Sequence, residues 1–162
     1  MNFLRTLIFA LALTFAFPAI SMAETFEHAE SGVQFESPNG WQSQVEEGAL
    51  IIAPKDGSIA LVFDVIDAKD LDMALEVLEK ELSSQFTNIK VKGDAETAKI
   101  NGMMAVAVEA DAKLEGAPVK LGLMLMETKS GKVLLALSFG EPKSMTKYES
   151  ELVKILMSIK SK

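Results

Sequence analysis

The chain has 162 residues, with 23 Asp and Glu against 16 Lys and Arg, a single His and no Cys. The formal net charge of −7 argues against binding to nucleic acid or to anionic membrane surfaces, because both favour basic protein surfaces. The lack of Cys excludes disulfides and cysteine-based catalysis, so stability must come from packing.

The first 23 residues have the features of a secretory signal peptide. Arg5 supplies positive charge, residues 7–17 form a short apolar run that ends at Pro18, and small residues precede the expected cleavage site after Ala23. The alternative is an uncleaved membrane anchor, but the run is shorter than the ~20 residues that a spanning helix needs. No Cys follows it, which excludes a bacterial lipid anchor. We therefore expect a soluble protein, exported to the periplasm or secreted.

Residues 24–162 would then form the mature chain. Removal of residues 1–23, which hold Arg5, leaves 139 residues and a net charge of −8. This length is ample for one domain with a real core and too short for two ordinary domains. We expect a single domain over residues 24–162.

The first expected strand follows a polar segment over residues 24–30. Val33 and Phe35 alternate with polar residues, and Ser37-Pro38-Asn39-Gly40 predicts a turn. Trp41, the only Trp of the chain, follows that turn. We interpret it as a core residue rather than as a residue that stacks on a ligand.

A hairpin and a helix are expected next. Asp56-Gly57 is a strong hairpin signal, and a two-residue loop there places Ile52 opposite Leu61. The same register places Leu50 opposite Phe63. Apolar residues at helical spacing then predict a helix over residues 70–86, with Asp67 or Asp70 as its N-cap.

A weaker strand is expected over residues 88–99, where Ile89 and Val91 alternate with lysines. Asn101-Gly102 would join it to the next strand in a hairpin. Because polar side chains dominate it, we expect it at the edge of the sheet.

Residues 103–140 read as three strands joined by two tight turns, at Glu115-Gly116 and at residues 129–131. The turn chemistry places Val108 opposite Leu123 and Leu125 opposite Leu135, so that large apolar residues share one face. The other face has small or flexible apolar residues: Ala105, Ala107, Gly122, Met124, Met126, Leu134 and Ala136. We expect both faces of this region to be covered, with a helix close to Ala107.

A second amphipathic helix is expected from residue 143 to about residue 160. Two amphipathic helices and a sheet that is apolar on both sides favour one arrangement. We predict an α+β fold with an antiparallel sheet of about six to seven strands and helices packed on both faces.

Residues 32–41, Gly-Val-Gln-Phe-Glu-Ser-Pro-Asn-Gly-Trp, and the helical ending at Ser158-Ile159-Lys160 resemble a known family. The pattern is similar to that of the superfamily of the photosystem II extrinsic protein PsbP, which includes exported bacterial proteins of the DcrB type and a nuclear-import factor that binds the Ran GTPase. The resemblance implies an antiparallel sheet between helices and a non-catalytic role in binding or assembling other proteins. No residues here match the metal sites of the plant members.

Signals of catalysis are few. A Ser-His-Asp site would have to use His28, for which we instead expect an exposed side chain without a role. Asp64 has apolar neighbours within its strand, and we interpret it as a structural, hydrogen-bonded carboxyl group. Because carboxylates are plentiful, a hydrolase with paired acidic residues stays open.

Cofactor and metal signals are also weak. The chain lacks a Gly-rich phosphate loop, and one His without Cys cannot supply a zinc site. Met103, Met124 and Met126 could offer thioethers to Cu(I), but Met also fills gaps in cores, and here each residue fits the alternating core pattern. We expect no cofactor and no metal.

Two functional hypotheses follow. The first is an exported, non-catalytic binding or assembly-assisting module whose partner is another exported or envelope protein, and it names no catalytic, cofactor or metal residues. The second is a small exported hydrolase that uses acidic residues. A concave pocket with two close carboxylates would favour the second hypothesis.

Overall fold

The computed structural model describes residues 24–162, so the predicted signal peptide lies outside the described residues. The helices are α2 (Leu71–Gln85) and α3 (Pro142–Ser158). The strands are β1 (Glu24–His28), β2 (Val33–Ser37), β3 (Trp41–Glu46), β4 (Ala49–Pro54), β5 (Ile59–Ile66), β6 (Thr87–Ile100), β7 (Met103–Leu114), β8 (Ala117–Glu127), β9 (Val133–Gly140) and β10 (Lys160–Ser161).

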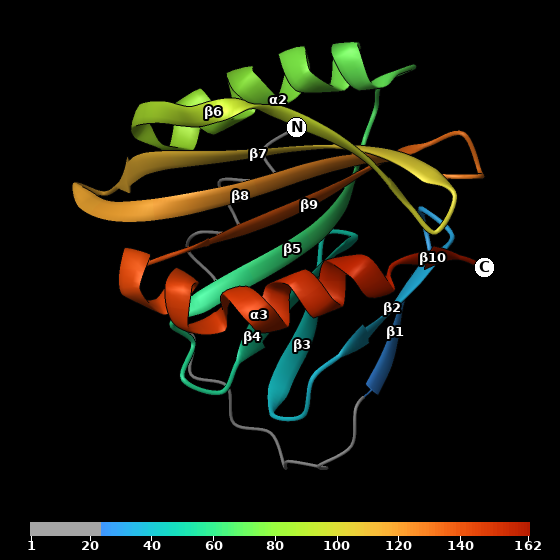
Figure 1. Ribbon diagram of the computed structural model, residues 1–162, viewed down its shortest axis with the longest axis horizontal. Helices are drawn as coiled ribbons and strands as arrows, with labels where there is room; N and C mark the ends of the chain where they lie inside the picture. Colours follow the sequence, from blue (N-terminus) through green and yellow to red (C-terminus); the bar gives the residue numbers. More distant parts are fainter. Residues whose placement is uncertain (1–23) are drawn as a thin grey trace.

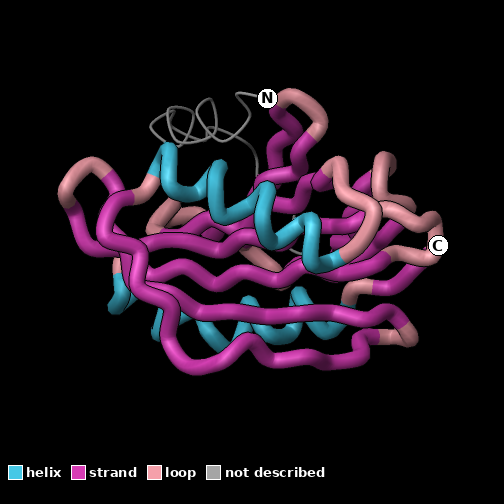
Figure 2. The backbone as a smooth tube through the Cα atoms, turned by 90° about the horizontal axis from the view of Figure 1, so that it is seen from above, coloured by secondary structure: helices cyan, strands magenta, loops and turns pink. Residues whose placement is uncertain are grey.

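A seven-stranded antiparallel sheet has the order β3-β4-β5-β9-β8-β7-β6, and a smaller sheet has the order β1-β2-β10. In Figure 1, α3 crosses in front of the large sheet near β5, and α2 lies at the top beside β6. Figure 2 shows the long strands running side by side. The expected antiparallel sheet with two helices is thus confirmed. Within residues 24–162, no helix is both long and apolar enough to cross a membrane.

The predicted strand registers are confirmed. Val108 lies opposite Leu123, and Leu125 lies opposite Leu135. At the turn between β7 and β8, Glu115 and Gly116 have φ values of 50° and 87°. Positive φ at both central residues gives the turn the twist of the strands that it joins, which fixes the register of the hairpin.

Two clusters of buried side chains lie on the two alternating sets of strand residues. One cluster joins Leu78 and Leu82 of α2 to residues such as Leu137. The other joins Leu152 and Ile155 of α3 to a different set: Leu61, Phe63, Ala105, Met124, Met126, Leu134 and Ala136. Because neighbouring strand residues point to opposite faces, the pattern of alternation assigns each helix its own set of partners.

Local signals explain where the two helices begin. The carboxylate of Asp70 accepts a hydrogen bond from the backbone N–H of Met73 at 2.8 Å, and so caps the first turn of α2. Of the two predicted caps, Asp70 is therefore the correct one. Helix α3 begins at Pro142, whose fixed φ and missing N–H suit the first turn.

Strand β6 lies at the edge of the large sheet, as predicted, and most of its side chains are exposed. Its pairing with β7 shifts twice, between Thr87 and Lys90 and between Lys92 and Glu96. Such bulges bend an edge strand and discourage its pairing with another chain.

Three strands differ from the sequence-based expectation. Residues 24–28, expected as a polar segment, form β1 against β2, and residues 41–46 form β3 against β4. Strand β10 extends the chain past α3 and pairs with β2. Each of these strands lies at an edge of its sheet, where polar side chains face solvent and hide the alternating pattern.

The two clusters predict that substitutions at core positions lower the free energy of unfolding more than a substitution at the surface. Leu137→Ala should lower the free energy of unfolding by about 2–5 kcal/mol by leaving a cavity in the α2 cluster. Ala105→Leu should cost about 1–3 kcal/mol, because Ala105 is 1% exposed within the α3 cluster. Denaturant melts measure both changes.

Met104→Ala is the control, since this neighbouring side chain is 39% exposed and its loss should cost about 0.5 kcal/mol or less. A neutral Ala105→Leu variant would contradict close packing on the side of the sheet that faces α3.

Candidate functional site

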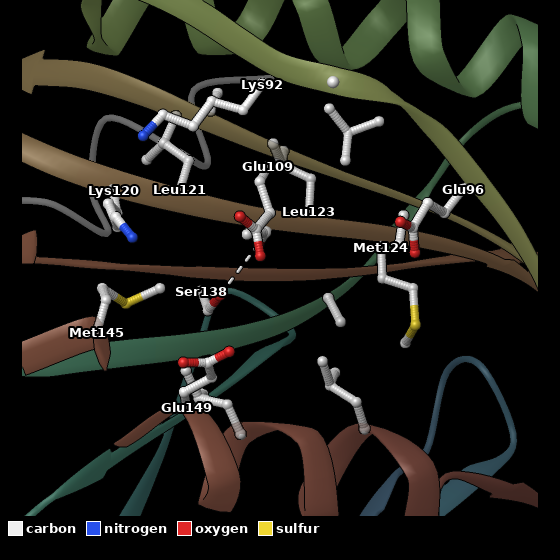
Figure 3. Close-up of a pocket in the computed structure, with 18 of the residues that line it drawn as sticks. Lys92, Glu96, Glu109, Lys120, Leu121, Leu123, Met124, Ser138, Met145 and Glu149 are labelled. Carbon is white, nitrogen blue, oxygen red and sulfur yellow. Dashed lines mark hydrogen bonds between the residues drawn. The ribbon is translucent and has the colours of Figure 1, made fainter. Parts of the chain in front are cut away.

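A pocket of about 460 Å³ lies between α3 and strands β6 to β9. This volume is within the range of roughly 300–1,000 Å³ typical of small-ligand sites. Figure 3 shows its labelled side chains, with strand residues on one side and Met145 and Glu149 of α3 on the other.

Two cross-strand rows line the sheet side of the pocket. In the first row, Glu109 of β7 lies opposite Lys92 of β6 on one side and opposite Gly122 of β8 on the other. Gly122 in turn lies opposite Ser138 of β9. The strand registers therefore place one basic residue, one acidic residue and two small residues side by side at the same level of the sheet.

The second row lies two residues away along β7, β8 and β9, and four residues away along β6, where the pairing shifts. It runs from Glu96 through Ala107 and Met124 to Ala136. Ala107 is half-buried and lines the pocket. Ala107 packs against the border of the α3 cluster, as expected, but the pocket keeps the contact with the helix incomplete.

Gly122 has no side chain to fill the pocket above β8. A Cβ atom at this position would lie 2.5 Å from Ser138 Oγ, which is closer than such atoms approach in proteins. Ser138 is buried, and its hydroxyl donates to the backbone carbonyl of Gly122 at 3.2 Å (Figure 3). A side chain at position 122 would therefore force the Ser138 hydroxyl to move, whereas glycine leaves both the hydrogen bond and the space above it in place.

The rim of the pocket is acidic. Five carboxylates and two ammonium groups line it, for a net charge of −3: Asp94, Glu96, Glu109, Asp111, Glu149, Lys92 and Lys120. Lys92 forms an ion pair with Asp111 at 2.7 Å. Figure 3 shows the carboxylates of Glu109 and Glu149 entering from opposite sides, with Ser138 between them.

Hydrogen bonds hold α3, the far wall of the pocket, at several points. Trp41 Nε1 donates to Glu151 at 2.6 Å, and the Tyr148 hydroxyl donates to Asp56 at 2.8 Å. At the other end, the Asn101 side-chain amide donates to the carbonyl of Ile159 at 2.7 Å. Each bond joins the helical segment to a different part of the fold.

Among these three acceptors, Asp56 receives the most hydrogen bonds. It receives hydrogen bonds from Ser58, Lys147 and Tyr148, and these bonds hold the pKa of its carboxyl group well below the ordinary value, with Ser58 as the largest cause. The ionised form of Asp56 is therefore the one that fits this end of α3.

Asp64 lies outside the pocket, on β5. Burial raises the pKa of its carboxyl group to about 6, and the negative charges of Glu30 and Glu81 add to the increase. One carboxylate oxygen accepts from the backbone N–H of Val65 at 2.7 Å, as expected for a structural carboxyl group.

The expectation of an exposed His28 is wrong. The side chain is 2% exposed, because the unpredicted strand β1 carries it into the small sheet. Its Nδ1 accepts from the backbone N–H of Ser31 at 3.3 Å and lies 3.0 Å from Ser31 Oγ, which donates to the His28 carbonyl at 3.2 Å. The hydroxyl proton is thus used within the turn, and the pair closes a loop rather than forming a nucleophile and its base.

The other singled-out residues belong to the core. Trp41 is 9% exposed and meets Tyr148 edge to face, with ring centroids 5.9 Å apart, as the core interpretation predicted. Met103, Met124 and Met126 are buried in the α3 cluster. Among residues 24–162, no group of three or more His, Asp or Glu side chains is arranged to hold a metal ion.

A second cavity, of about 710 Å³, lies between α2 and strands β6 to β8. Its lining is mostly aliphatic or aromatic, including Leu78, Phe86, Val106 and Leu125. A ligand site usually combines an apolar surface with a few converging polar groups. Both cavities meet that description, and we take the acidic pocket as the candidate site because its seven charged groups can select a ligand by charge.

Sequence reasoning did not find this pocket. Its carboxylates come from the neighbouring strands β6 and β7 and from α3, and only the packing of α3 on the sheet brings Glu149 to the others. One signal was present: the predicted hairpin register already placed Glu109 opposite Gly122. A charged residue facing a glycine, beside a row of small residues, marks space on a sheet surface.

Comparisons with known proteins show the fold. No family model and no curated protein sequence matches the chain. The solution structure of cyanobacterial PsbP (CyanoP) from Synechocystis is similar, with a TM-score of 0.62 and 12% identity, over 93% of this chain and 99% of that one.

Two further structures share the fold. LpqN of Mycobacterium tuberculosis, described as involved in cell envelope biogenesis, has a TM-score of 0.59 and 14% identity, over 85% of this chain and 89% of LpqN. PA94 of Pseudomonas aeruginosa, of unknown function, has a TM-score of 0.58 and 14% identity, over 86% of this chain and 97% of that one. The chain therefore has a PsbP-like fold, as the sequence resemblance implied.

The buried His28 predicts a pH dependence of stability. Burial lowers its pKa below the ordinary value of 6.5, and the backbone carbonyl of Gly48 offsets only part of the decrease. The stability that neutral His28 provides is therefore present above pH 6.5 and is lost as the pH falls below that value. Melts of the wild type and of His28→Gln between pH 7.5 and 5 measure it.

The gap in stability between the two proteins should narrow as the pH falls. Taking the difference cancels the contribution of Asp64, whose raised pKa acts in the opposite direction. A gap that stays constant across this range would show that His28 does not titrate differently in the folded chain.

Proposed function

We propose that this chain is a non-catalytic binding module, in which a sheet held between two helices presents the acidic pocket to a ligand or to a side chain of a partner protein. The observation that supports this most directly is the pocket itself, with its apolar floor, its convergent carboxylates and a far wall held by hydrogen bonds. Such a wall favours binding, because little order is lost when the ligand arrives.

The distribution of titratable groups favours binding over catalysis. A general acid needs a proton near neutral pH, which for a carboxyl group requires a raised pKa. Asp64, whose carboxyl pKa burial raises to about 6, is not among the pocket residues. His28, the only His of the chain, lies in a closed turn and does not line the pocket either.

One observation favours a second candidate function. Glu109 and Glu149 face the same space from opposite sides, as a pair of carboxylates does in many glycoside hydrolases (Figure 3). A small hydrolase that uses these two residues is therefore the alternative.

The proposal includes export and an envelope partner. The signal-peptide features of residues 1–23 support export, and LpqN, which shares the fold, is described as acting in cell envelope biogenesis. We propose another exported or envelope protein as the partner. Mass spectrometry of the mature chain should place Glu24 first, and a mature chain that still contains Arg5 would contradict export with cleavage.

A pocket-filling variant tests the binding function. Ala107→Trp should occupy the open floor of the pocket, and denaturant melts should show that the variant folds. The wild-type chain is used to capture a partner from the exported fraction, and we expect Ala107→Trp not to capture it. The control, Glu127→Gln, changes an exposed residue outside the pocket and should still capture it. Capture of the same partner by both variants would place the binding surface elsewhere.

An assay of hydrolysis separates the two candidate functions. We expect the wild type to show no turnover of chromogenic glycosides, esters or phosphates above the blank. Glu109→Gln and Glu149→Gln should then give the same result as the wild type. Wild-type turnover that falls about 100-fold or more in either variant would establish the hydrolase instead.

A further inference from the structure

We infer that the acidic pocket selects a cation: an ammonium or guanidinium group attached to a short apolar chain. The inference rests on the proposed binding function and names the chemistry of the ligand. It follows from the charge of the rim, from the apolar floor, and from the way in which three elements direct their side chains at one concave space.

The available charge lies on four carboxylates. The ion pair with Lys92 occupies Asp111, whereas Asp94, Glu96, Glu109 and Glu149 make no ion pair within residues 24–162. Glu109 and Glu149 reach the space above Ser138 from the sheet and from α3, and Glu96 borders its other end (Figure 3). A cation between Glu109 and Glu149 would meet negative charge on both sides.

Exposed carboxylates are common on an acidic chain, so their position matters here more than their number. A solvated acidic surface usually spreads its charges over a convex face, where they repel one another least. These carboxylates instead surround a concavity with a floor of Ala107, Met124 and Ala136. Ala107 is half-buried and offers the apolar surface of that floor to a ligand, whereas Met124 and Ala136 are 5% and 2% exposed.

The remaining pocket residues limit the ligand further. Lys120 lies at one end of the pocket, away from Glu96, and would repel a second positive charge (Figure 3). The net charge of −3 on the lining disfavours anions. A ligand with one positive charge and a short apolar part fits both the rim and the floor.

This chemistry has two sources: a free organic amine, or a Lys or Arg side chain of a protein partner. Titrations followed by NMR test both sources, with phenethylamine as the free amine and the tripeptide acetyl-Gly-Lys-Leu-amide as the peptide. Two matched probes have a similar apolar part. Phenethyl alcohol is uncharged, and 3-phenylpropanoate has a negative charge.

We expect saturable binding of at least one cationic probe, at least about tenfold tighter than binding of the alcohol, and no saturable binding of the carboxylate. The double variant Glu109→Gln/Glu149→Gln should weaken cation binding by about tenfold or more. The control, Glu76→Gln/Glu127→Gln, changes the net charge equally outside the pocket and should change affinity by less than about twofold.

Tighter binding of the peptide would identify a protein partner as the source, and tighter binding of phenethylamine would identify a free amine. The inference is overturned if neither cation binds, if the alcohol binds as tightly as the amine, or if the pocket double variant binds like the control. If, in that case, the wild type captures a partner that Ala107→Trp does not capture, the binding function stands and only the inferred chemistry of the ligand is wrong.

Discussion

The position of α3 against the sheet decides whether a pocket exists at all. Hydrogen bonds hold it at several points, among them those from Trp41 to Glu151, from Tyr148 to Asp56, and from Asn101 to the carbonyl of Ile159. Two of these three involve a carboxylate and are therefore stronger than bonds between neutral groups. Because the partners lie on β3, on the turn after β4 and on the hairpin between β6 and β7, α3 is fixed only when the whole sheet has formed.

The sheet beneath α3 contributes the second requirement, which is space. The register of β8 and β9 brings Gly122 against Ser138, and the register of β7 and β8 brings Glu109 against Gly122. A slip by one residue would turn these side chains away from α3 and would place large apolar residues under it. The same pairing that builds the two buried clusters thus also sets the depth and the charge of the pocket.

Local chemistry explains which parts of the fold could be predicted from sequence. The turn at Glu115-Gly116 fixes its own register, so the hairpin of β7 and β8 was predictable pair by pair. Strand β3 was not, because polar residues between Trp41 and Val45 hide its alternation. The burial of His28 depends on the pairing of β1 with β2, and the pocket depends on contacts between segments far apart in sequence, for which no local pattern exists.

The most direct test of this account is to locate a bound cation by intermolecular NOEs between phenethylamine and the methyl groups of the protein. The account predicts contacts with Ala107, Met124 and Ala136 on the floor of the acidic pocket. Contacts with Leu78 and Leu82 instead would place the ligand in the apolar cavity beneath α2 and would contradict the assignment of the site.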